Sequence, residues 1–186
     1  KRQLLVPFVV IGLIGVAGAG GLLLTQGYRM ERITVWLDPA ASEKGHQTIQ
    51  GLYAIGSGGL FGKGLGQSMQ KLGFLPEANN DMIFSVICEE LGLFGALCVL
   101  ALFFALIWRF MVIAVNAPDL YGSMIVVGVI AHIGIQVFIN IAVATNTIPN
   151  TGIPLPFISY GGSSLVFMLL EMGLVLSVSR YINVKK

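Results

Sequence analysis

The sequence predicts an all-α integral membrane protein with four transmembrane helices and one large extramembrane loop. Of its 186 residues, 55% are hydrophobic and only 11% are charged, and the mean hydropathy is +0.84. Soluble domains carry about 25% charged residues. Four apolar segments approach or exceed the roughly 20 residues needed to cross a bilayer. The net charge is only +2, and the sequence contains no run of basic residues. Both observations argue against nucleic-acid binding.

The whole chain, residues 1–186, is expected to form part of one membrane domain. The expected spans are 4–24, 82–108, 120–144 and 163–180. The last span is short, but Tyr160 and Tyr181 flank it as interfacial anchors would. The first segment could instead be a signal peptide, since Lys1 and Arg2 precede it. Its apolar run is too long for a signal peptide and further spans follow, so a span is favoured.

The distribution of basic residues predicts the orientation. With four spans, the basic groups at both ends of the chain and Arg109 fall on one side of the membrane. The positive-inside rule makes that side cytoplasmic. The loop 25–81 and the shorter segment 145–162 then lie outside. Several basic residues in the first loop make the distribution of basic residues between the two sides less unequal. Long loops count little in this rule, so the predicted orientation is kept.

The outer loop 25–81 is too long to be a plain connection. Trp36-Leu37-Asp38-Pro39 is typical of chain at the headgroup level, and residues 45–53 are expected to form a short interfacial helix. The glycine-rich stretch 56–66 could cradle a phosphate or form a tight turn at the membrane surface. It lacks the Gly-Lys-Ser/Thr ending of a P-loop. The loop ends at Asp81, which could be a catalytic base or only a helix cap.

Polar residues inside the expected spans point to helix contacts. His132, Gln136 and Asn140 share one helix face, and such residues usually bond to neighbouring helices; a role in a polar cavity is the alternative. Glu171 lies mid-span and must be paired or protonated. We expect Glu89 and the adjacent Glu90 to point one into a cavity and one toward a helix partner, and their divergence by about 100° disfavours a shared metal ion.

The two cysteines and the segment 151–164 allow two further predictions. Cys88 and Cys98 are expected to be packing residues, because ten residues of helix separate them by about 15 Å, beyond disulfide reach. Residues 151–164 are dense in proline and glycine between two spans. Irregular backbone at membrane depth is tolerated only against protein or a wet cavity. This segment is therefore expected to line a cavity together with the Asp81 loop.

Several motifs in collinear order resemble the FtsW/RodA/SpoVE (SEDS) family. They are Trp36-Leu37-Asp38-Pro39, Gly45-x-Gln47-x-x-Gln50, Gly64-Leu65-Gly66-x-Ser68-x-Gln70-Lys71, Leu75-Pro76-Glu77 with Asp81 behind it, Glu89-Glu90-Leu91-Gly92, and the run from Pro154 to Ser164. Each is weak alone, but together they cover nearly the whole chain and are highly specific. One departure is visible: Asn79-Asn80 stand where family members often have His-Thr. This argues against a mechanism that needs a histidine there.

The resemblance implies a ten-helix peptidoglycan glycosyltransferase that polymerises lipid II into glycan strands at the outer face of the bacterial cytoplasmic membrane. The chain starts with Lys1 rather than Met, and we expect it to be the carboxy-terminal four helices and outer loop, inactive alone. The family's essential aspartate maps onto Asp81, the implied general base of an inverting transfer. A class B penicillin-binding protein is the implied partner, and no organic cofactor or nucleic acid is implied. Division, elongation and sporulation all remain open as roles.

The substrate contacts expected from this resemblance are Lys63, Ser68, Gln70, Lys71, Glu77, Ser159 and Ser163. Lys63 and Lys71, with Arg29 and Arg32, are candidates to neutralise the leaving pyrophosphate. A divalent cation, Mg²⁺ or Mn²⁺, is expected to assist, with ligands unknown. Two other functions stay open: a lipid II flippase that uses the polar face and Glu171, and a noncatalytic scaffold for the penicillin-binding protein.

Overall fold

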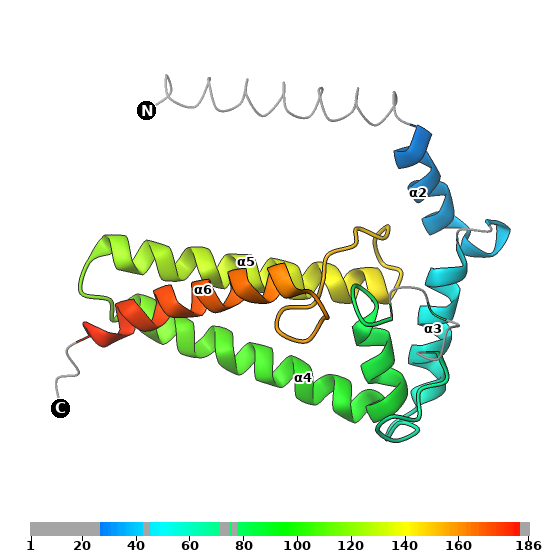
Figure 1. Cartoon of the computed structure of the whole chain (residues 1–186), viewed down its shortest axis with the longest axis horizontal. Helices are drawn as coiled ribbons and strands as arrows, with labels where there is room; N and C mark the ends of the chain where they lie inside the picture. The colour runs from blue at the N-terminus through cyan, green and yellow to red at the C-terminus, as the bar shows by residue number, and fades with distance from the viewer. Residues whose placement is uncertain (1–26, 43–44, 71–74, 76–77, 183–186) are drawn as a thin grey trace.

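The computed structural model describes residues 27–42, 45–70, 75 and 78–182, and every regular element within these ranges is a helix (Figure 1). Three of the helices are long and apolar enough to cross a membrane: α4 (Ile83–Val115), α5 (Leu120–Ala144) and α6 (Gly162–Arg180). The prediction of an all-helical fold with helices long enough to span a membrane is therefore confirmed for the described residues, while the number of four spans stays a prediction. The expected first span, 4–24, lies outside the described residues.

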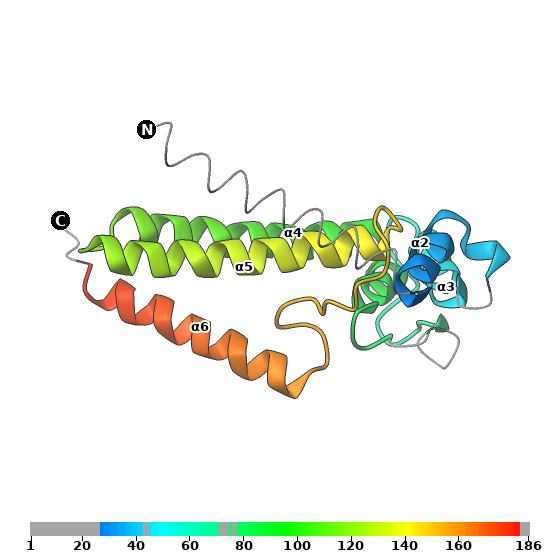
Figure 2. The same ribbon diagram turned by 90° about the horizontal axis from the view of Figure 1, so that it is seen from above.

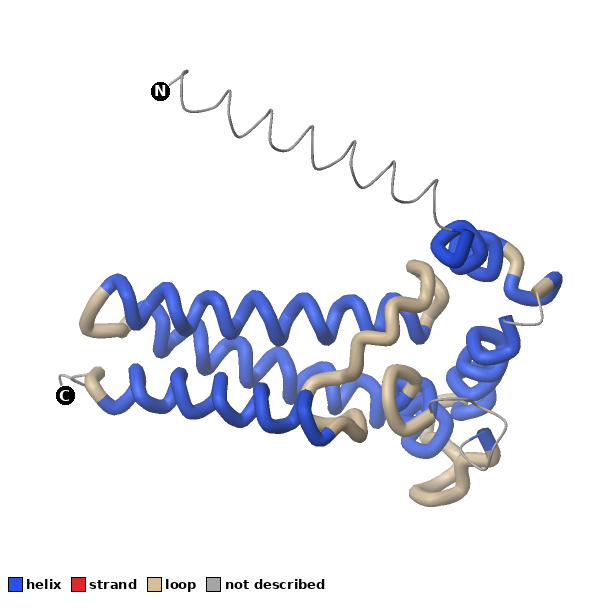
Figure 3. The backbone as a smooth tube through the Cα atoms, turned by 45° about the horizontal axis from the view of Figure 1, so that its top comes forward, coloured by secondary structure: helices blue, strands red, loops and turns tan. Residues whose placement is uncertain are grey.

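Local sequence accounts for the ends of the long helices. The side chain of Asp119 caps α5 by accepting a hydrogen bond from Gly122 N at 3.2 Å. α4 continues past the expected end at Trp108 and stops at Val115, shortly before Pro118, whose ring disfavours helical geometry in the preceding residue. A short turn joins α4 to α5, whereas the long connections gather at the opposite end of the bundle (Figure 3).

The three long helices form an open bundle. α4 and α5 run side by side, and their buried contact includes Phe103, Val126 and Ile133. α6 converges on them at its carboxyl end but splays away at its amino end (Figure 2). Only Met168 and Val175 of α6 are buried, so most of this helix is exposed in the chain.

Shorter helices lie at the other end of the bundle from the α4–α5 turn. These are α2 (Gly27–Leu37), the 3₁₀ helix η1 (Pro39–Ala41) and α3 (His46–Gly58). α3 runs across the long axis of the bundle (Figures 1 and 2). Helix was expected in this region over 45–53, and it extends to Gly58. Trp36 Nε1 donates a hydrogen bond to Asn146 O at 3.0 Å, which ties α2 to the end of α5.

α4 is broken at Gly92, whose φ of 69° and ψ of −166° are not helical. In a regular helix the N–H groups of residues 93 and 94 would donate to the carbonyls of residues 89 and 90. Here they donate to Gly59 O and Leu60 O, at 2.9 and 3.1 Å. In return, Lys63 N and Gly64 N donate to the carbonyls of residues 89 and 90, both at 2.9 Å. The loop after α3 thus replaces two helical hydrogen bonds.

This break corrects the prediction that residues 82–108 form one uninterrupted helix. It lies between the two cysteines, both of which are free. Cys88 is buried, as expected for a packing residue, whereas Cys98 is exposed on α4. The packing prediction is therefore wrong for Cys98 within this chain.

Candidate functional site

Asp81 lies in the turn directly before α4, and the residue is buried, with 8% of its surface exposed. The residue at the capping position is Met82, whose side chain makes no capping hydrogen bond. Asp81 therefore stands one residue outside that position. Its Oδ1 accepts a hydrogen bond from Gln47 Nε2 on α3 at 3.4 Å. The carboxylate is thus shielded by protein and held by a neutral amide.

The loop between α5 and α6 closes a second side of Asp81. Gln47 Oε1 accepts a hydrogen bond from Asn150 Nδ2 at 3.3 Å, so one amide bridges this loop and the carboxylate. A methyl group added at Gly152 would stand 4.0 Å from Asp81 Oδ2, and Gly152 has a φ of +71° that favours glycine. The loop backbone therefore borders the carboxylate closely.

Three consecutive main-chain oxygens, those of residues 79–81, hold the Asp81 turn in place. Their donors, in order, are Tyr160 N at 2.8 Å, Ser159 Oγ at 2.6 Å and Asn140 Nδ2 at 2.8 Å. Ser159 Oγ also accepts a hydrogen bond from Leu155 N at 2.7 Å. The proline- and glycine-rich loop thus lies against the Asp81 turn, while the expectation that the two line a cavity together stays a prediction. A fixed turn of this kind gives its side chain a defined position.

A second polar cluster surrounds Glu89, which is completely buried. Its Oε1 lies 2.7 Å from Lys63 Nζ, and its Oε2 accepts a hydrogen bond from Ser68 Oγ at 2.5 Å. The main-chain N–H groups of Met69 and Gln70 add longer hydrogen bonds, both at 3.4 Å. A buried carboxylate needs such compensation to remain charged. Lys63 and Ser68 are therefore gathered at Glu89 and not at Asp81.

The other residues expected to contact substrate are dispersed. Lys63 and Gln70 line an open pocket of about 420 Å³ together with Tyr53 and Ser57. Ser163 is exposed in the first turn of α6. Lys71 and Glu77 lie outside the described residues, as does the side chain of Arg29. Arg32 Nη1 donates a hydrogen bond to Asn150 O at 2.7 Å, so it contacts the loop that borders Asp81.

The polar face of α5 makes hydrogen bonds between elements, as predicted. His132 Nδ1 lies 2.7 Å from Glu171 Oε1 on α6, and Gln136 Nε2 lies 3.1 Å from His132 Nε2. Glu171 is therefore paired within this chain. Asn140 contacts the Asp81 turn and the main-chain oxygen of Ile153 instead. This face thus joins α5 to α6 through His132 and joins α5 to the candidate site through Asn140.

Sequence reasoning did not assign the partners of Asp81. Gln47 was visible only as part of a glycine–glutamine spacing, and Asn140 only as part of a polar helix face. Nothing local to either residue indicates that it meets Asp81, since both contacts join distant segments. Among the described residues, no group of three His, Cys, Asp or Glu side chains is arranged to hold a metal ion.

The comparisons with known proteins identify the family to which the chain is related. A family model described as cell cycle protein, FtsW/RodA/SpoVE, matches residues 2–184. Stage V sporulation protein E of Bacillus subtilis is 56% identical over 178 residues, which cover 94% of this chain and 48% of that protein. A probable peptidoglycan glycosyltransferase FtsW of Coxiella burnetii is 45% identical over 179 residues, 93% of this chain and 48% of that protein. The chain spans about half the length of these relatives.

Two solved structures are similar in fold. One, from work on the structural coordination of polymerization and crosslinking by a peptidoglycan synthase complex, has a TM-score of 0.70 at 29% identity. It covers 100% of this chain and 51% of the other. The other, the rod shape determining protein RodA of Thermus thermophilus, has a TM-score of 0.54 at 38% identity. It covers 70% of this chain and 39% of the other.

Proposed function

Because the chain belongs to the FtsW/RodA/SpoVE family, we propose that it is part of a peptidoglycan glycosyltransferase. The enzyme polymerises lipid II into glycan strands at the outer face of the cytoplasmic membrane. The observation that carries the proposal is the buried carboxylate of Asp81, fixed between α3, α5 and the α5–α6 loop. Relatives named as probable peptidoglycan glycosyltransferases support the reaction class.

Asp81 acts as the general base in this proposal. The 4-hydroxyl of an acceptor N-acetylglucosamine attacks the anomeric carbon of the donor sugar and loses its proton to the carboxylate. The new glycosidic bond forms as the bond to the undecaprenyl pyrophosphate breaks, with inversion at the anomeric carbon. A positioned base contributes about 10²- to 10⁴-fold to such a step. The carbonyl contacts of residues 79–81 support this role by holding the carboxylate in one place.

The leaving pyrophosphate requires positive charge. Arg32, which contacts the loop beside Asp81, is a described candidate for it, whereas Lys63 is already paired with Glu89. Mg²⁺ is commonly held by one or two carboxylates together with substrate phosphates. Because Asp81 is the proposed base, the substrate pyrophosphate would supply most of that donor set, and a divalent cation stays part of the proposal on that ground. When bound, it would neutralise charge on the leaving group.

The membrane orientation is proposed from the ends of the bundle. Arg109 and Arg180 lie near the carboxyl ends of α4 and α6, away from the end where Asp81 precedes α4. Under the positive-inside rule this places Asp81 on the outer side, where lipid II presents its sugars. We propose a class B penicillin-binding protein as the partner, in keeping with the similar structure that concerns polymerization and crosslinking.

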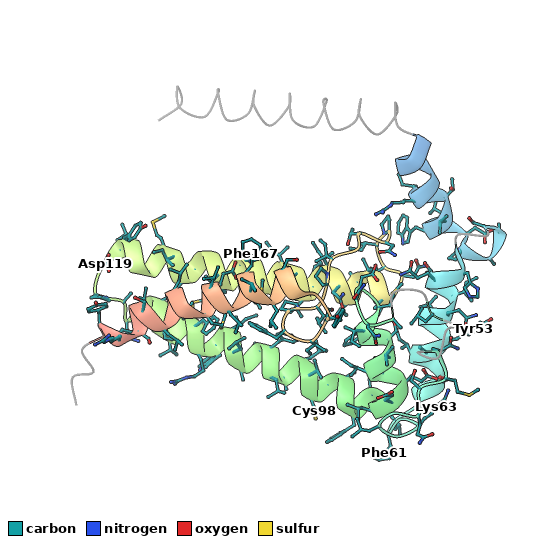
Figure 4. The ribbon with its side chains drawn as sticks, in the orientation of Figure 1. Tyr53, Phe61, Lys63, Cys98, Asp119 and Phe167 are labelled. Carbon is teal, nitrogen blue, oxygen red and sulfur yellow. The ribbon has the colours of Figure 1, made fainter. Side chains whose placement is uncertain are left out.

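The test compares Asp81→Ala with the unchanged protein, using the full-length chain in lipid vesicles. We expect glycan polymerisation to be lost while binding to the penicillin-binding protein is retained. Asp119→Asn is the matched control, because asparagine also caps helices and Asp119 lies at the opposite end of the bundle (Figure 4). Normal polymerisation by Asp81→Ala would refute the catalytic proposal and favour the scaffold.

The transporter remains the second candidate because one observation favours it. His132, Gln136 and Glu171 form a connected polar group within two spanning helices, which is unusual unless it serves a path or ties helices together. Glu171→Gln separates the functions. A flippase would lose lipid II translocation in vesicles, whereas a polymerase would retain glycan synthesis in proportion to the folded protein.

A further inference from the structure

The loop after α3 carries an exposed apolar surface that the proposed reaction does not use. We call residues 59–66 the glycine-rich tip. Leu60, Phe61 and Leu65 are exposed there, Phe61 to 83% of its surface. Exposed clusters of large apolar side chains usually mark an interface with protein or membrane. We propose that the glycine-rich tip is inserted into the bilayer leaflet at this end of the bundle.

The backbone at the centre of the tip is suited to an apolar environment because three consecutive amides, those of residues 62–64, have internal partners. Gly62 N donates to Gly58 O at 2.8 Å, and Lys63 N and Gly64 N donate to carbonyls of the broken α4. Chain that contacts lipid must satisfy its polar groups in this way. Gly62, with a φ of +78°, could not be replaced, since a methyl group there would stand 2.1 Å from Glu90 O.

The single charge of the tip is neutralised by the protein. Lys63 is the only charged residue within 59–66, and its Nζ lies 2.7 Å from the buried carboxylate of Glu89. The side chain is thereby directed toward the protein, while Phe61 is left exposed. An ammonium group without such a partner would oppose insertion. The pairing removes that obstacle.

The tip is also continuous with the surface of a spanning helix. Leu93 and Phe94 begin the part of α4 beyond the break, their side chains are exposed, and their N–H groups donate to the carbonyls of Gly59 and Leu60. Figure 4 places Phe61 at the corner where α4 bends and Cys98 farther along the same edge. Because α4 is an apolar spanning helix, this continuity favours lipid over a protein partner as the occupant.

The consequence is an anchor at the break in α4. Since the same loop supplies the hydrogen bonds that replace the lost helical ones, immersion of the tip would hold the break at the membrane surface. α3, which carries Gln47 at its other end, would be held there too. The inference does not depend on the catalytic proposal, because it concerns only where the tip lies.

The test is spin labelling of the full-length protein in phospholipid vesicles. Accessible native cysteines, including Cys98, are first replaced, and one nitroxide is placed by Phe61→Cys, Phe104→Cys or Thr147→Cys. Phe104 is exposed on the spanning part of α4, and Thr147 is exposed beyond the end of α5. The measured quantity is the ratio of accessibility to oxygen over accessibility to a water-soluble nickel chelate.

We expect the ratio at position 61 to be several-fold above that at 147 and to approach that at 104. A ratio at 61 equal to that at 147 would overturn the proposal, because the tip would then lie in water. Low accessibility to both reagents would overturn it too, since protein would then cover the tip. If Phe61→Cys does not fold, the same accessibility ratio is measured at Leu65→Cys, with the same expected result.

Discussion

The side-chain amide of Asn140 donates one hydrogen bond to the main-chain oxygen of Asp81, at 2.8 Å, and a second to that of Ile153, at 2.9 Å. Asn140 is fully buried. A single side chain of α5 therefore holds together the turn before α4 and the loop before α6, which are the two segments that border the candidate base.

Replacing Asn140 with leucine should misplace Asp81. The change leaves two buried carbonyl oxygens without donors, and each unsatisfied group costs about 1–3 kcal/mol. A misplacement of about 1 Å at a reactive group can reduce the rate about 100-fold. We expect lipid II polymerisation by the full-length Asn140→Leu variant to fall by about that factor.

Gln136→Leu is the control for this prediction. It removes an amide one turn earlier on α5, where the contact is with His132 rather than with the Asp81 turn. We expect it to keep most polymerisation per folded molecule. Equal losses in the two variants would show that Asn140 has no particular role at the site.

Replacing Lys63 and replacing Glu89 should lower the free energy of unfolding by unequal amounts. Lys63→Met leaves a fully buried carboxylate without its cation, and breaking a buried pair in this way costs about 3–5 kcal/mol. Glu89→Gln removes the buried charge and keeps an oxygen that can accept hydrogen bonds from Lys63 and Ser68, so we expect a smaller loss, of about 1 kcal/mol. Thermal unfolding of the full-length protein in detergent measures both.

The double variant Lys63→Met with Glu89→Gln should be more stable than Lys63→Met alone. It removes the uncompensated charge while keeping an acceptor for Ser68. Additive losses in the double variant would mean that the two side chains are not coupled.

The break in α4 predicts that Gly92 cannot be replaced. An alanine methyl group there would stand 2.4 Å from Gly62 N, and the φ of +69° is itself strained for any other residue. We expect Gly92→Ala to lower the free energy of unfolding by about 3 kcal/mol or more. Gly128→Ala on α5 is the control, since nothing lies within 4 Å of the added group. It should be neutral or stabilise by about 0.5–1 kcal/mol. Equal melting temperatures for the two variants would contradict the observed break.

The long helices could be predicted from the sequence, but the break in α4 could not. Length and hydropathy suffice to predict α5, because a capped apolar run of this length has few alternatives. The break at Gly92 was not predictable, since an isolated glycine in an apolar run is tolerated in a helix. Its cause is the loop at 59–64, which exchanges hydrogen bonds with α4. That pairing depends on tertiary structure and leaves no periodic signal.

The central residue of the candidate site, Asp81, could be predicted from the sequence, but the residues that contact it could not. Asp81 stood out as a carboxylate where a polar loop meets an apolar helix, and the proline-rich loop was expected beside it. The contacts of Gln47 and Asn140 with Asp81 join residues far apart in the sequence. Lys63 and Ser68, whose contact with substrate stays a prediction, lie on Glu89, because burial of that carboxylate requires donors close to it.

The central claim is that the Asp81 carboxylate removes the proton of the acceptor sugar. The most direct measurement is the initial rate of lipid II polymerisation by the full-length Asp81→Asn variant, with its penicillin-binding protein partner present. Asparagine has nearly the same shape and can still contact Gln47, but it cannot accept the proton. We predict a rate at least about 100-fold below that of the unchanged protein, with unchanged thermal stability and with Asp119→Asn fully active. A rate within a few-fold of the unchanged protein would contradict the account.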